Sequence, residues 1–132
     1  MLNGFDKQTE PLTGYELEKL LPVIVQGLRH HIGEAKAVTN GTIVKSLTNL
    51  GYRISTARVR KIINHIRCCG YVKCLVATSK GYYVATSPDE MSDYIDSLKG
   101  REQAISAVRA SMEQQYGEWL NIINQKNHHH NV

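Results

Sequence analysis

The chain has 132 residues, of which 42% are hydrophobic and 21% are charged. These fractions are typical of a soluble globular protein and exclude a disordered chain. No apolar run reaches the roughly 18 to 20 residues that span a bilayer. The first residues have no basic segment followed by an apolar one, so they do not resemble a secretory signal. We therefore expect a cytoplasmic protein without membrane contact.

The net charge of +4 is unevenly distributed along the sequence. Residues 35–88 contain no Asp or Glu but nine of the sixteen Lys and Arg residues, and all twelve acids lie outside them. We call residues 35–88 the acid-free window. A basic segment without acids is typical of a surface that binds a polyanion, most often nucleic acid.

The start of the chain predicts an N-terminal extension, residues 1–20, that leads into a helix. Thr13 and Glu16 have the spacing of a capping box. Apolar residues then recur at helical spacing to about His31. Pro22 has no amide hydrogen and predicts either a bend or a new helix start at that point.

Two short helices are predicted next, inside the acid-free window. The first begins at Thr39 or Asn40, and the second follows Ser55 and stops at Gly70. Two short helices joined by a few residues, the second of them basic, are typical of a helix-turn-helix.

A β-hairpin is predicted directly after these helices. Residues 71–76 have the pattern of a strand, 77–80 of a polar turn and 81–85 of a returning strand. A hairpin in this place corresponds to the wing of a winged helix. We therefore predict a mainly α (α+β) protein, in which residues 21–87 form a winged helix-turn-helix DNA-binding domain with a two-stranded wing.

A long C-terminal helix is predicted over residues 88–124, beginning after Ser87 with Pro88 and two acids. Its apolar residues follow a seven-residue repeat that Arg101 and Gln115 interrupt. The helix either packs within the chain or pairs two copies, and we favour a homodimer. The seam would contain Met91, Tyr94, Leu98, Ile105, Val108, Met112 and Trp119. Residues 125–132 are expected to form a disordered tail.

The predicted helix after Ser55 has two distinct faces. Its apolar residues gather on one side, and its basic and amide residues lie on the other. Arg and Lys pair with guanine edges, Asn pairs with adenine, and every cation attracts phosphate. The alternative is an ordinary solvated helix face. The predicted DNA-binding residues of the two helices and the wing are Thr39, Thr42, Lys45, Ser55, Thr56, Ala57, Arg58, Arg60, Lys61, Asn64, His65, Thr78, Ser79 and Lys80.

Catalytic and metal chemistry are not expected. The three cysteines Cys68, Cys69 and Cys74 lack the second pair of ligands that a zinc site requires. The histidines at 128–130 have the character of a tail. The acid-free window offers no carboxylate for acid–base catalysis. We therefore expect a non-enzymatic protein with no cofactor and no metal.

Two segments resemble a winged-helix family encoded by bacteriophages and prophages. They are residues 54–60, Ile-Ser-Thr-Ala-Arg-Val-Arg, and residues 77–90, which include Ser-Lys-Gly-Tyr-Tyr. The resemblance covers roughly residues 20–116. It implies a protein that binds double-stranded DNA in the host cytoplasm and controls phage transcription or replication. The alternative is an interaction module that docks onto a replication or packaging protein.

Overall fold

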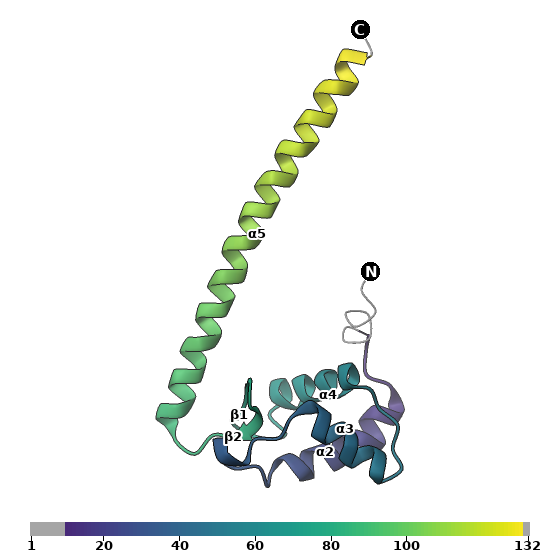
Figure 1. Cartoon of the computed structure of the whole chain (residues 1–132), viewed down its shortest axis with the longest axis vertical. Coiled ribbons are helices and arrows are strands. Elements are labelled where there is room, and N and C mark those ends of the chain that lie inside the picture. Colours follow the sequence, from purple (N-terminus) through teal and green to yellow (C-terminus); the bar gives the residue numbers. More distant parts are fainter. Residues whose placement is uncertain (1–9, 131–132) are drawn as a thin grey trace. The chain divides into compact units, whose positions relative to one another are not determined.

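The computed structural model describes residues 10–130 and divides the chain into two units, one up to Met91 and one from Ser92 onward (Figure 1). Predictions for residues 1–9, for 131–132 and for the side chains at 128–130 lie outside the described residues. The described part is mainly helical. The elements are η1 (Glu16–Leu20), α2 (Leu21–Leu28), η2 (Glu34–Lys36), α3 (Asn40–Asn49), α4 (Thr56–Cys69), β1 (Leu75–Thr78), β2 (Gly81–Val84) and α5 (Pro88–His130).

The first helical segment begins with the predicted capping box. The Thr13 amide donates to Glu16 Oε1 at 2.9 Å, and the Glu16 amide donates to Thr13 Oγ1 at 3.2 Å. The helix continues through η1, a π-helix, directly into α2. Pro22 lies in the first turn of α2, where its missing amide hydrogen leaves a carbonyl of the preceding turn without its usual donor. The wide turn of η1 accommodates that loss.

The segment before residue 21 is part of the first unit rather than an extension of it. Leu20 is fully buried, and Glu16 is 6% exposed. Burial of an apolar side chain stabilises the folded chain by about 1.5 to 3 kcal/mol. The helix therefore starts the domain, and the predicted boundary at residue 21 is too late.

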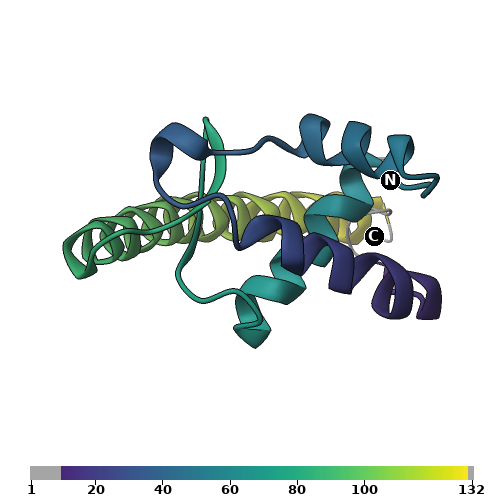
Figure 2. The ribbon, with the colours of Figure 1, turned by 90° about the horizontal axis from the view of Figure 1, so that it is seen from below.

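The core of the first unit is formed where three helices and the hairpin meet. Figure 2 shows α4 (teal) crossing α2 (dark blue) at a steep angle. The apolar side of α4 predicted from helical spacing consists of Val59, Ile62, Ile63 and Ile66, and all four are fully buried. The core contains Leu20, Ile24, Leu28, Val38, Leu47, Val59, Ile62, Ile63, Ile66, Val72, Leu75 and Tyr82.

The boundaries of α3 and α4 agree with the predicted caps. Thr39 Oγ1 accepts a hydrogen bond from the Thr42 amide, and Ser55 Oγ accepts one from the Arg58 amide. Gly70 ends α4 with φ +72°, a conformation that favours glycine. The two short helices predicted inside the acid-free window are therefore present, and a winged helix is compatible with them.

The hairpin starts later than the sequence pattern predicts. Residues 71–74 form turns, and Cys74 has φ +57°. The first strand therefore begins at Leu75. Antiparallel pairing from Leu75–Val84 to Thr78–Gly81 leaves a two-residue turn, residues 79–80.

A short extended segment joins the hairpin to the start of α3. Val38 and Tyr82 exchange two backbone hydrogen bonds, of 3.0 and 2.8 Å. The Tyr82 hydroxyl also donates to Asn40 Oδ1 at 2.8 Å. This isolated antiparallel bridge fixes β2 against the residues that precede α3.

Helix α5 is continuous over 43 residues. Ser87 Oγ accepts from the Glu90 amide at 3.2 Å, and the Glu90 carboxylate accepts from the Thr86 amide at 2.8 Å. Residues 125–130 are helical where a disordered tail was expected. No Gly or Pro occurs after Gly117 to end the helix.

The close approach of the hairpin to residue 38 predicts a severe effect of Gly81→Ala. Gly81 has φ +120°, and a Cβ atom there would lie 2.4 Å from the carbonyl oxygen of Val38. We expect the free energy of unfolding to fall by about 2 kcal/mol or more. Chemical denaturation monitored by circular dichroism would measure the loss.

Gly27→Ala is the matched control for that substitution. Gly27 lies inside α2, and nothing lies within 4 Å of a Cβ atom added there. We expect this change to stabilise the protein by about 0.5 to 1 kcal/mol, because alanine is the better helix former. Equal effects of the two substitutions would contradict the close approach at Gly81.

Candidate nucleic-acid interface

Helix α4 presents one polar stripe to solvent. Thr56, Arg60 and Asn64 are exposed at a spacing of four residues, so they lie along one side of the helix. Lys61 is half-buried at the edge of the stripe. Among the described residues, neither Arg60 nor Lys61 forms an ion pair with a carboxylate. These donors are therefore available to an external acceptor.

Arg58 does not belong to this exposed stripe, contrary to the sequence prediction. Its guanidinium contacts the Glu16 carboxylate through Nε at 2.8 Å and Nη2 at 2.6 Å. The same group donates to the carbonyl oxygens of Glu10 and Pro11, both at 2.9 Å. The Arg58 side chain is 13% exposed. Its donors satisfy acceptors within the chain rather than facing a ligand.

The Glu16–Arg58 ion pair is the principal electrostatic contact of the first unit. Hydrogen bonds from Arg58 hold the pKa of the Glu16 carboxyl below its ordinary value, against the opposing effect of burial. The same contact raises the pKa of Arg58. Two bonds to one carboxylate fix the guanidinium in place. The first turn of α4 is thereby fixed to the start of η1.

The hairpin turn carries Thr78, Ser79 and Lys80, all exposed as predicted. Thr78 Oγ1 accepts from the Lys80 amide at 3.2 Å and so supports the turn. The Lys80 ammonium pairs with the Glu34 carboxylate, which raises the pKa of Lys80. Both partners are exposed to water, so the pair contributes little to stability. An anionic ligand at Lys80 would compete with Glu34.

The start of α3 lies beside an open hollow. Thr39 and Thr42, both predicted site residues, line it together with His30, His31 and Lys36. His31 Nδ1 donates to the Lys36 carbonyl oxygen at 2.8 Å. The sequence prediction did not include His30 or Lys36. The basic character of Lys36 within the acid-free window was the signal that could have found it.

The remaining predicted residues have different surroundings. Lys45 is exposed on α3, Ala57 is half-buried, and the Ser55 hydroxyl caps α4. The His65 ring lies 5.9 Å from the Tyr71 ring, measured between centroids, and 3.8 Å from Cys69 Sγ. His65 is therefore directed toward the residues that follow α4 rather than along the polar stripe.

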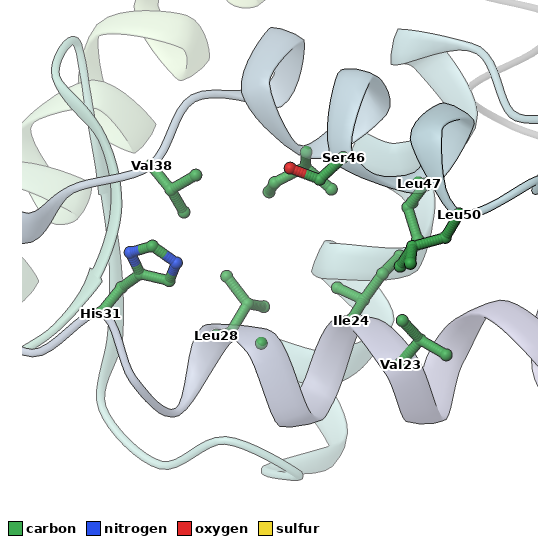
Figure 3. A pocket seen from close by; sticks show the side chains of 10 residues that line it. Val23, Ile24, Leu28, His31, Val38, Ser46, Leu47 and Leu50 are labelled. Carbon is green, nitrogen blue, oxygen red and sulfur yellow. The ribbon is translucent and has the colours of Figure 1, made fainter.

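An apolar groove lies between α2 and α3, with a cavity volume of about 190 Å³. Figure 3 shows Val23, Ile24 and Leu28 on one side and Leu47 and Leu50 on the other. The polar side chains on its wall are those of Ser46 and His31. Such a lining does not suit a phosphate backbone, so the groove is distinct from the polar stripe of α4.

No metal centre is found in the part of the chain that the structure describes. Cys68, Cys69 and Cys74 are exposed free thiols. No group of three or more His, Cys, Asp or Glu side chains is placed to hold an ion among residues 10–127. None of the described helices combines the length and apolar character that crossing a bilayer requires.

The predicted dimer seam on α5 is largely exposed. Tyr94 is buried, and Met91 is half-buried. The other five predicted seam residues, Leu98, Ile105, Val108, Met112 and Trp119, are between 39% and 69% exposed.

The Glu16–Arg58 pair predicts a specific dependence of stability on pH. The folded-state pKa of Glu16 lies below the ordinary value of 4.5, so the stabilisation is complete above that value. It is lost as the pH falls through the lowered folded-state pKa. We expect Glu16→Gln to cost about 2 kcal/mol at pH 7 and to make the loss of stability below pH ~4.5 less steep. Urea denaturation across this pH range measures both effects.

Glu18→Gln removes an equal charge from an exposed position two residues away. This variant should keep the wild-type stability at pH 7 and the wild-type steepness in acid. A Glu16→Gln variant with the same acid profile as wild type would show that the pair does not carry the stabilisation.

Comparison of the chain with protein-family models, curated proteins and solved structures finds no match.

Proposed function

We propose that the first unit is a winged helix that binds double-stranded DNA, with α4 in the major groove and the β1–β2 turn on the neighbouring backbone. The proposal includes a role in phage transcription or replication control, which rests only on the sequence resemblance. Binding by this unit needs neither a cofactor nor a covalent step.

The single observation that carries the proposal is the exposed stripe of α4. Thr56, Arg60 and Asn64 lie on one side of a helix whose other side is fully buried, with Lys61 beside them. A hydroxyl, a guanidinium, an amide and an ammonium supply the donors and acceptors that read base edges and hold phosphate. An ordinary solvated face would pair such cations with carboxylates.

Two other segments support the same surface. The hydroxyls of Thr39 and Thr42 lie at the start of α3 beside Lys36, a set suited to phosphate. Strand β2, which follows the β1–β2 turn, is held to this segment by the Val38–Tyr82 backbone bonds. Phosphate contacts from both segments would position α4 over the bases.

Dimerisation through α5 is part of the proposal. A second copy would double the number of phosphate contacts and would read two half-sites, as symmetric DNA-binding proteins do. The exposed apolar side chains of α5 support this assignment.

The double variant Arg60→Ala/Lys61→Ala tests the surface directly. We expect its affinity for a pool of mixed-sequence duplexes, or for a selected duplex, to fall at least tenfold. If the wild-type surface makes about six phosphate contacts, its affinity should fall roughly 10³-fold between 50 and 200 mM salt, and the variant should show a smaller salt slope. Fluorescence anisotropy titrations at several salt concentrations measure both quantities.

Lys19→Ala/Lys99→Ala is the charge-matched control. Both lysines are exposed and lie outside the acid-free window, on η1 and α5. This variant has the same net charge as the test variant, so it should bind duplex nearly as wild type does. Equal losses in the two variants would show only a nonspecific charge effect. A folded wild-type chain that binds no duplex at low salt would overturn the proposal and favour the protein-docking alternative.

A further inference from the structure

The second unit carries an exposed apolar stripe that differs from the predicted seam. Tyr116 is 62% exposed and Ile123 is 40% exposed. Neither belongs to the seam predicted from the sequence, and Ile123 lies past its last residue, Trp119. On a helix that turns by about 100° per residue, eight positions fall within about 80° of arc. They are Leu98, Arg101, Ile105, Val108, Met112, Tyr116, Trp119 and Ile123.

We propose that two copies of the chain pair through this stripe in antiparallel orientation. The inference rests on the dimer of the proposed function and adds its direction. The eight positions are symmetric about Ala110 to within one residue, so an antiparallel partner places each half of the stripe against the other half. The opposed pairs are Leu98 with Ile123, Arg101 with Trp119, Ile105 with Tyr116, and Val108 with Met112.

Arg101 decides between the two orientations. It is the only charged residue in the stripe, and a parallel in-register pair would place it against its own copy. Like charges in a seam repel each other. The antiparallel pair instead places the guanidinium against the Trp119 indole, the aromatic ring that attracts cations most strongly. In this orientation Arg101, which interrupts the apolar pattern, makes a favourable contact with Trp119 of the second copy.

The centre of the stripe is also electrostatically compatible with this arrangement. Arg109 and Glu113 form an ion pair along the helix, with Nε 3.3 Å from Oε1. Both residues lie on one flank of the stripe, close to its midpoint. An antiparallel partner brings its own Arg109 and Glu113 to the same place with the order reversed. The four charges would then alternate in sign across the dimer.

The area of the stripe suits a second helix of the same kind. If each of the seven apolar side chains buries on the order of 100 Å², one helix contributes about 700 Å². That value approaches the ~800 Å² per partner of a standard stable interface. The stripe is its own complement, as an interface with two-fold symmetry requires.

Disulfide trapping in the full chain tests the orientation. Cys68, Cys69 and Cys74 are exposed and are replaced by Ser to give a background without thiols. Leu98→Cys and Ile123→Cys are then made as separate chains, mixed and treated with a mild oxidant. Positions 98 and 123 lie about 38 Å apart along one helix, so they cannot form a bond within a chain.

The antiparallel dimer predicts crosslinked dimers in the mixture and almost none when either variant is oxidised alone. Peptide mass spectrometry should identify the 98–123 bond. Gln103→Cys mixed with Gln114→Cys, on the opposite face of α5, should remain uncrosslinked. Bonds of 98 to 98 and of 123 to 123 would overturn the orientation while leaving the proposed dimer intact.

Light scattering on the unmodified chain separates the other outcomes. A monomer at all concentrations, or a dimer with no bond at these positions, overturns the inference. DNA binding through α4 is scored independently by the Arg60→Ala/Lys61→Ala variant. A double-mutant cycle of Arg101→Ala and Trp119→Ala gives a second readout. The symmetric dimer contains this contact twice. We therefore expect the dimer dissociation constant to show a coupling of about five- to thirtyfold between two residues that are roughly 27 Å apart within one chain.

Discussion

The ion pair between Glu16 and Arg58 is the contact on which the first unit depends. It joins the start of the first helix to the first turn of α4, and Arg58 also binds the backbone of residues 10 and 11. A partly buried ionised side chain is tolerated only when it is paired with an opposite charge and its hydrogen bonds are satisfied. Loss of either partner would leave the other charge in a poorly solvated place. The position of α4 in the first unit therefore depends on a residue outside the acid-free window.

Local features of the fold could be predicted from the sequence, because their physical causes lie within a few residues. Each helix end is set by residues next to it. Thr13 and Glu16 form the capping box of the first helix, Ser55 caps the start of α4, and Gly70 ends α4 in a left-handed conformation. The buried face of α4 follows from helical spacing alone. The late start of β1 could not be predicted, because it depends on the left-handed conformation of Cys74.

The candidate site was harder to predict because pairing between distant residues decides which charges are available. Arg58 appears in the sequence to be one more cation of a basic helix, but its partner lies 42 residues earlier. Lys80 likewise pairs with Glu34, just before the acid-free window. Absence of acids in a segment therefore does not mean that its cations are unpaired. Thr56, Arg60 and Asn64 remain as the predicted residues that lie on the exposed stripe of α4, with Lys61 at its edge.

The close packing of Gly81 on the Val38 carbonyl has a consequence for recognition. Strand β2, next to the hairpin turn, is joined to the start of α3 by the Val38–Tyr82 backbone bonds and by the Tyr82–Asn40 contact. These bonds restrain the two segments relative to each other. A ligand that touches both segments does not have to order either of them, so it avoids the entropic cost that a free loop would impose. Because residue 81 has no side chain, β2 can pack on the Val38 carbonyl, and the two segments are held in place before a ligand binds.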